Sequence, residues 1–300
     1  MLRIAIAAVV AIVVVVAAVF WWLSAPAELG PLPPYAASAA HGRAVFLAGG
    51  CASCHAMPNQ KDQTLLGGGL ALATAFGTFH VPNISPDPKA GIGAWSEHDF
   101  ADALLLGTGR GGINLYPALP YTSYHLMTLP DVRDLYAYLH TLKPSPNVVP
   151  PHALSFPFDI RRGIGLWKRI YFRPGPFRPD PSKSAEWNRG AYLVEGPGHC
   201  AECHSPRDAF GGIVAGARFA GGRTLDGKHD VPNITQDKDG IASWSVEDIA
   251  DMLDDGVTPG GDSVSGDMRE VVDNLSQLPA ADRHAMAVYL KSLPPHPTEH

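Results

Sequence analysis

The pentapeptides CASCH at residues 51–55 and CAECH at residues 200–204 contain all four cysteines of this 300-residue chain. Two thiols about one helical turn apart can each form a thioether with one haem, and the histidine that follows can bind the iron. A single copy could also be a dithiol redox pair or half of a zinc site. Two complete copies with no cysteine left over predict two covalently bound haem c groups. The predicted attachment residues are Cys51, Cys54, Cys200 and Cys203, and the predicted axial histidines are His55 and His204.

The first thirty residues contain a long apolar segment. Residues 4–23 form an uninterrupted apolar run that follows Arg3 and contains Trp21 and Trp22 near its end. A run of this length can span a bilayer, whereas the apolar region of a signal peptide is usually about 7–15 residues long. We therefore predict a transmembrane anchor within residues 1–30, with a cleaved signal as the alternative. Arg3 favours an N-terminus on the inside, so in both cases the remaining chain is predicted to be periplasmic, at the inner membrane if the anchor is retained.

The charge balance argues against one class of partner. The chain has 23 Lys and Arg against 29 Asp and Glu, a formal net charge of −6. Nucleic-acid-binding proteins usually present a surplus of basic residues. We therefore predict no nucleic-acid partner.

The two haem motifs belong to a longer internal repeat. At an offset of 149 or 150 residues, VPNI at 81–84 recurs at 231–234, and WS at 95–96 recurs at 244–245. The repeat predicts an all-α fold of two tandem class I cytochrome c domains, at residues 38–143 and 185–294, after the N-terminal transmembrane helix. Each domain would contain a first helix (39–48, 185–194), a middle helix and a last helix (about 131–142, 280–292). The middle helices are predicted to begin at the N-caps Ser96 and Ser245, each with an aspartate at the third position, and to end at Gly107 and Gly256.

Residues 144–184 connect the repeats. This segment is rich in proline and then in basic and aromatic residues, unlike a flexible Gly/Ser linker. We predict a strap packed across both domains. A docking surface for a partner or for the membrane is the alternative.

The sixth iron ligands are predicted to differ between the repeats. Met268, in a polar glycine-rich stretch 64 residues after His204, is the predicted ligand of the second haem. The equivalent position after His55 is Leu119, which cannot bind iron. Met127, His125 or an open iron remain as alternatives for the first haem, with Met127 as the prediction. Asn83 and Asn233 are either haem-propionate donors or residues that cap local turns.

Several stretches resemble the multihaem cytochrome c subunits of membrane-bound bacterial alcohol, gluconate and aldehyde dehydrogenases. They are VPNI to WS (81–96), LYPALPY (115–121), WNRGAYLV (187–194) and GHCAECHSPR (198–207). The resemblance covers nearly all of the chain after residue 38. The chain departs from the family in two respects. It has two haem motifs where those subunits often have three, and it has PALPY where the family has PAMPY.

The resemblance implies an electron-transfer subunit. Such a subunit accepts electrons from a catalytic dehydrogenase subunit and passes them to a respiratory acceptor, such as a quinone, a cytochrome or a terminal oxidase. The residues themselves suggest no acid–base or nucleophilic catalysis, so the chain is predicted not to be an enzyme by itself. The alternatives are a catalytic dihaem peroxidase or small-molecule reductase with an open first haem, and a soluble electron shuttle.

Overall fold

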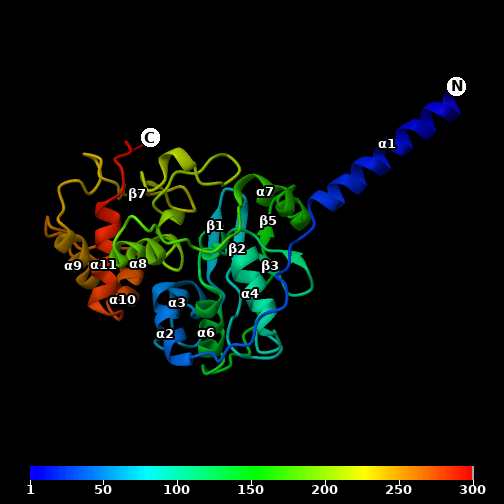
Figure 1. The fold of residues 1–300 in the computed structure, drawn as a ribbon. Coiled ribbons are helices and arrows are strands. Elements are labelled where there is room, and N and C mark those ends of the chain that lie inside the picture. The colour runs from blue at the N-terminus through cyan, green and yellow to red at the C-terminus, as the bar shows by residue number, and fades with distance from the viewer. Residues whose placement is uncertain (299–300) are drawn as a thin grey trace.

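The structure, a computed structural model, describes residues 1–298. It is largely helical, and an apolar N-terminal helix projects from a globular part (Figure 1). The α-helices are α1 (Leu2–Leu23), α2 (Ala39–Ala48), α3 (Cys51–His55), α4 (Glu97–Leu106), α5 (Tyr121–Tyr124), α6 (Leu129–Leu139), α7 (Ile164–Tyr171), α8 (Ala185–Glu195), α9 (Val246–Asp255), α10 (Asp267–Leu275) and α11 (Ala280–Lys291). The 3₁₀ helices are η1 (Arg161–Gly163), η2 (Cys200–Glu202) and η3 (Ala215–Ala217).

Short strands make the all-α expectation too strict. β1 (Ala71–Thr74), β2 (Gly77–His80) and β5 (Ala153–Leu154) form an antiparallel sheet in the order β1-β2-β5. Two further antiparallel pairs are β3 (Thr108–Gly109) with β4 (Ile113–Asn114) and β6 (Gly222–Arg223) with β7 (Asp230–Val231). These strands are two to four residues long. Segments this short carry too little alternation of polar and apolar residues to be recognised from sequence.

The predicted caps of the middle helices are confirmed. In α4, Ser96 Oγ accepts a hydrogen bond from the Asp99 amide at 3.1 Å, and the Asp99 carboxylate accepts one from the Ser96 amide at 2.8 Å. Ser245 and Asp248 form the same reciprocal pair at the start of α9. The capping glycines Gly107 and Gly256 have φ values of 61° and 78°, which suit glycine at a helix end.

The first and last helices of each repeat cross closely at a glycine. α2 packs on α6, and α8 packs on α11. A Cβ atom at Gly42 would overlap the carbonyl oxygen of Asp134, and one at Gly190 would overlap that of Ala285. The absence of a side chain at these two positions is therefore what allows the helices to approach.

Replacing Gly190 with alanine is expected to destabilise the fold by about 2–3 kcal/mol, because the methyl group forces α8 and α11 apart. Helix propensity alone would predict a gain in stability, because alanine favours a helix more than glycine does. A loss of stability would therefore identify the packing effect. Chemical denaturation would measure it. Gly216→Ala is the control because nothing lies within 4 Å of a Cβ atom there, and equal stabilities of the two variants would contradict the prediction.

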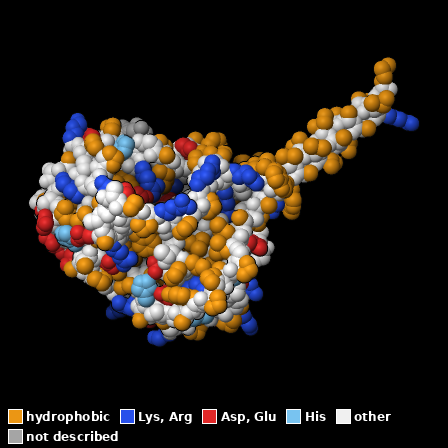
Figure 2. All heavy atoms as spheres, viewed as in Figure 1, with side chains coloured by type: hydrophobic (Ala, Val, Ile, Leu, Met, Phe, Trp, Pro, Cys, Tyr) orange, Lys and Arg blue, Asp and Glu red, His pale blue; other side chains and the backbone are white. Residues whose placement is uncertain are grey.

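The apolar helix α1 is attached to the first repeat. It is 22 residues long, about 33 Å at 1.5 Å per residue, and hydrophobic side chains cover it along its length (Figure 2). The chain that follows runs along α4 and α6. Thr108 donates to the Ala27 carbonyl at 2.6 Å, Asp102 accepts from the Leu29 amide at 2.7 Å, and Arg133 donates to the Pro33 carbonyl at 2.6 Å. The second repeat, with α8, α9 and α11, lies on the far side of the first repeat from α1 (Figure 1).

The connecting segment contacts both repeats. β5 pairs with β2 of the first repeat, and α7 reaches the second repeat, where Trp167 Nε1 donates to the Phe210 carbonyl at 2.9 Å. Phe177 then donates its amide to the Leu126 carbonyl and packs its ring on Tyr192. With η1 and α7 the segment is partly helical, which its proline content concealed at the level of sequence.

Candidate haem sites

The first CxxCH motif is a one-turn helix. α3 begins after Gly50, whose φ of 54° lets the chain turn sharply out of α2. This turn places Cys51 and Cys54 one helical turn apart, with Cys51 partly buried and Cys54 exposed. Two thiols in this arrangement can bond to the same edge of one flat cofactor.

The second motif forms a 3₁₀ turn in place of the α-helical turn, and the residue before it has a strained backbone conformation. η2 begins after His199, whose φ of 40° lies in the left-handed region where Gly50 stands in the first motif. A non-glycine residue in that region is strained, and such strain is concentrated at functional sites. The His199 Nδ1 lies 2.8 Å from the Pro197 carbonyl oxygen, so the ring is oriented by its own loop.

Both motif histidines are oriented by a backbone carbonyl. His55 Nδ1 lies 2.8 Å from the Pro82 oxygen, and His204 Nδ1 lies 2.7 Å from the Pro232 oxygen. A carbonyl can only accept, so Nδ1 carries the proton and Nε2 keeps its lone pair for a metal. Burial lowers the pKa of both imidazoles, which favours the neutral form that binds iron. This explains why VPNI is repeated together with CxxCH: the proline carbonyl of each VPNI segment orients the motif histidine. The sequence alone did not predict this contact.

The four cysteines are free thiols, the form from which a thioether to haem is made. Burial raises the pKa of the partly buried Cys51 and Cys200 to about 12, above the usual range of a thiol. Within residues 1–298, no group of three or more His, Cys, Asp or Glu side chains is placed to hold a metal ion. A pair of thiols beside one oriented imidazole fits covalent haem c at both motifs.

The repeated asparagines are structural. Asn83 is buried and donates to the Ser145 and Asn147 carbonyls, while its side-chain oxygen accepts from the Ser85 amide. Asn233 likewise accepts from the Thr235 amide and donates to the C-terminal segment at His296. Their polar atoms are occupied, so the interpretation as propionate donors is wrong for both.

The residues considered as sixth ligands lie in different environments. Met268 is at the start of α10 and Leu119 precedes α5, and both are partly buried against the hydrophobic core. Met127 is 2% exposed and lies within that core. The His125 ring faces the connecting segment, where Nδ1 pairs with Gly175 and the ring edge packs on Phe172. Met268 and Met127 stay the predicted ligands, with His125 or an open iron as the alternatives for the first haem.

The two motifs meet where the repeats pack together. Ser53 of the first motif accepts a hydrogen bond from Asn274 of α10 at 3.1 Å. Glu202 of the second motif accepts from Thr122 of α5 at 2.6 Å. Between them, the Tyr124 ring packs edge-on against His199 with centroids 5.3 Å apart. Each CxxCH motif is therefore fixed by residues of the other repeat.

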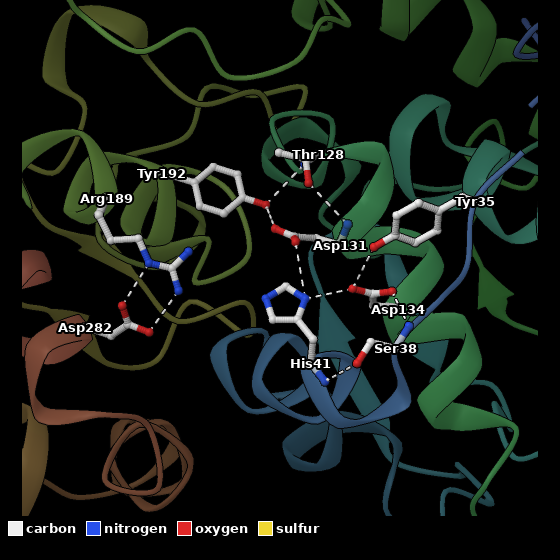
Figure 3. Close-up of polar contacts among 9 residues, drawn as sticks. All are labelled: Tyr35, Ser38, His41, Thr128, Asp131, Asp134, Arg189, Tyr192 and Asp282. Carbon is white, nitrogen blue, oxygen red and sulfur yellow. Dashed lines mark hydrogen bonds and ion pairs between the residues drawn. The ribbon is translucent and has the colours of Figure 1, made fainter. Parts of the chain in front are cut away.

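A second polar cluster joins the repeats beside α2 and α8. Tyr192 of α8 donates to Asp131 of the first repeat and accepts from the Thr128 amide at 3.1 Å (Figure 3). His41 of α2 lies 2.8 Å from the Asp134 carboxylate and 3.7 Å from that of Asp131. The cluster continues the interface and fixes the relative position of the repeats.

Glu202 is the charged centre of the motif interface. Its carboxylate is nearly buried and pairs with Arg207 at 2.6 Å, besides accepting from Thr122 and Ser123. Burial alone would raise the pKa of this carboxyl, but Arg207 and the Thr122 hydroxyl lower it below its usual value. Glu202 is therefore ionised at neutral pH and binds the second motif to α5.

Replacing Glu202 with glutamine is expected to cost about 3 kcal/mol of folding stability, because the partly buried Arg207 loses its charged partner, whose own side chain is nearly buried. A carboxyl with a lowered folded-state pKa stabilises above its unfolded pKa and loses that effect as pH falls. The difference from wild type should therefore be full above about pH 5 and shrink in more acidic buffer. Denaturant titration across pH measures it, with Glu186→Gln as the exposed control, and a difference independent of pH would contradict the prediction.

Comparison with known proteins agrees with this geometry. Residues 39–143 match the family model described as cytochrome c. The chain is 45% identical over 277 residues to a diheme cytochrome c-type protein of Cereibacter sphaeroides, covering 91% of this chain and 92% of that protein. It is 39% identical to a nicotinate dehydrogenase subunit of Pseudomonas putida and 38% identical to the fructose dehydrogenase cytochrome subunit of Gluconobacter japonicus.

The coverage of these relatives differs. The matches span 90% of this chain in both dehydrogenase proteins, but only 23% of the nicotinate dehydrogenase subunit and 55% of the fructose dehydrogenase subunit. Membership of the cytochrome c family implies covalently bound haem c, as the CxxCH motifs predict. The chain belongs to the family of c-type cytochromes that includes dihaem cytochrome c and the cytochrome c subunits of alcohol, fructose and gluconate dehydrogenases, as the resemblance predicted.

Proposed function

We propose that the chain is the electron-transfer subunit of a membrane-bound dehydrogenase complex. Each repeat would be a class I cytochrome c domain with one covalent haem, bound by Cys51 and Cys54 in the first and by Cys200 and Cys203 in the second. Haem c supplies a centre that accepts and releases one electron at a time. The observation that carries the proposal is the meeting of the two CxxCH motifs at one interface, since electrons must pass between neighbouring centres.

The protein side chains would hold and orient these centres. The carbonyls of Pro82 and Pro232 keep His55 and His204 as neutral ligands. Met268 would complete the second site and Met127 the first. The contacts of Glu202 with Arg207 and Thr122 would hold the second motif on α5, and the contact of Ser53 with Asn274 would hold the first motif on α10.

The attachment of α1 suggests a direction of flow. The segment after α1 is bonded along the first repeat, through Ala27 and Leu29, so this repeat would lie next to the bilayer. Electrons would then enter at the second repeat, from a catalytic dehydrogenase subunit. They would leave from the first repeat to a quinone, cytochrome or terminal oxidase. Arg3, which precedes the apolar segment, favours an N-terminus on the inside and so supports a periplasmic location for both repeats.

The proposal is tested in native membranes with and without this chain. Ethanol, D-gluconate, D-fructose and nicotinate, the substrate types in the relatives' names, are added separately while absorbance at the haem bands and oxygen uptake are followed. One of them should reduce the haems and drive oxygen uptake only when the chain is present. Loss of the chain without any change in substrate-dependent oxygen uptake would contradict the proposal.

A second candidate function rests on Leu119. This leucine stands where Met268 stands in the second repeat, so the first haem would be open to small ligands if no other residue binds it. The protein would then be a dihaem peroxidase or reductase. Carbon monoxide added to the reduced protein distinguishes the two functions, because an electron carrier with six-coordinate haems leaves the spectrum unchanged.

A further inference from the structure

Residues 161–173, RRGIGLWKRIYFR, contain five basic residues and no acidic residue. Within residues 1–298, none of these five forms an ion pair, although arginines elsewhere pair with Asp or Glu (Arg110, Arg133, Arg189, Arg207, Arg218, Arg223, Arg269 and Arg283). The whole chain carries a net charge of −6, so this local excess of positive charge is opposite in sign to the net charge of the protein.

Two of these arginines bind the end of the apolar helix α1. Arg162 donates to the Trp21 carbonyl at 2.6 Å and to Ser24 Oγ at 2.9 Å, and its guanidinium lies 4.0 Å from the Trp21 ring centre. Arg169 donates to the Leu23 carbonyl. The last carbonyls of a helix lack intrahelical donors, and these side chains supply them. At Gly165, α7 approaches so closely that a Cβ atom would overlap Ser24, so α7 rests directly on the exit of α1.

This contact sets the depth of α7 relative to a bilayer. A helix of 22 residues spans about 33 Å, close to the hydrocarbon thickness of about 30 Å, and tryptophans gather at the headgroup level. Trp21 and Trp22 are therefore expected at the interface, and η1 and α7, bonded to Trp21, Leu23 and Ser24, lie at the same level.

Exposed apolar side chains accompany the basic residues. Ile170 of α7 is 67% exposed and Phe156 before η1 is 79% exposed, and Ile160 is also exposed. Figure 2 shows Lys and Arg side chains next to the point where the apolar helix meets the globular part, with hydrophobic side chains around them. A surface of this mixed kind suits the boundary between headgroups and acyl chains.

We propose that residues 156–173, here called the basic collar, bind the anionic phospholipid headgroups that surround α1. With Asp159 included, the collar carries five basic residues and one acidic residue. The phosphate groups would neutralise the unpaired guanidinium groups, of which Arg169 and Arg173 are the most exposed, and the exposed Phe156 and Ile170 would enter the acyl boundary. The collar would hold the first repeat at a fixed tilt on the membrane, next to its acceptor. The inference rests on the proposed function to the extent that α1 spans the bilayer.

The test uses full-length holoprotein in nanodiscs, with a nitroxide on Ile170→Cys. The four native cysteines are bonded to haem in the proposed holoprotein, so the introduced thiol is the only one free to react. Electron paramagnetic resonance measures collisions of the nitroxide with oxygen, which enters lipid, and with a water-soluble nickel complex. Asp251→Cys on α9, in the distant repeat, is the matched control. Mass spectrometry of the reconstituted protein establishes separately that residues 1–23 are retained.

In nanodiscs containing phosphatidylglycerol, the Ile170 label should be protected from nickel and the Asp251 label should not. In the part of the chain that the structure describes, the exposed Arg173 side chain donates only to the Arg169 and Phe172 carbonyls. Arg173→Gln should lower the ratio of docked to undocked collar roughly fivefold. Arg223→Gln in the second repeat should leave it unchanged.

Equal nickel access at Ile170 and Asp251 overturns the proposal, and so does equal protection in phosphatidylcholine alone, because contact would then not depend on anionic lipid. Protection that arises only when a dehydrogenase is added assigns the collar to a protein interface and overturns it too. Loss of residues 1–23 in the mature protein would remove the basis of the collar without affecting the electron-transfer proposal, which the membrane reduction experiment tests on its own.

Discussion

Replacing Met268 with leucine is expected to convert the haem of the second repeat from low-spin to high-spin and to lower its reduction potential by on the order of 100 mV. A thioether sulfur stabilises reduced iron, and leucine fills a similar volume without any donor atom. Met268 lies at the start of α10 and is partly buried against the core, so it is placed by a helix that also contacts the first motif through Asn274. Electron paramagnetic resonance and a redox titration measure the two effects.

Met252→Leu is the matched control for this variant. Met252 is another partly buried methionine of the second repeat and packs on the same core from α9, so the substitution changes packing to a similar degree. Its haem should stay low-spin. An unchanged spectrum in both variants would show that Met268 is not a ligand, whereas high-spin signals in both would point to a general loosening of the repeat.

The features that sequence predicted correctly are those set by local chemistry. Ser96 with Asp99 is a capping box that needs only four consecutive residues, so its outcome in α4 could be anticipated. Gly107 and Gly256, predicted as the ends of the middle helices, likewise cap α4 and α9.

The features that sequence missed depend on contacts between distant segments. Nothing near Arg162 in the chain indicates that it binds the end of α1, 138 residues away at Ser24. The link between Glu202 and Thr122 likewise exists only because the repeats pack together. The α7 helix was concealed by the prolines before and after it, and its stability comes from docking on α1 and on the C-terminal end of α4, where Lys168 binds two carbonyls.

The role of the first haem depends on Met127, and Met127→Leu is expected to turn one low-spin signal of the holoprotein into a high-spin signal. Met127 follows α5, the helix that binds Glu202 through Thr122 and packs Tyr124 between the motifs, so a ligand at this place would connect the first iron to the interface. Leucine preserves the packing of a side chain that is 2% exposed, which separates ligation from stability. Electron paramagnetic resonance at low temperature counts the two spin states directly.

Leu119→Met is the converse experiment. It restores the methionine at the position equivalent to Met268, so in the Met127→Leu background it should return the first haem to the low-spin state. Met286→Leu, at a core methionine that is 1% exposed, should change neither signal. If the wild-type protein already contains one high-spin haem that Met127→Leu leaves unchanged, while Leu119→Met alone makes it low-spin, the first site is open. The chain would then bind small molecules at the repeat next to the membrane, because an open iron has a free position for a substrate and a six-coordinate haem has none. The catalytic function would then replace simple electron transfer.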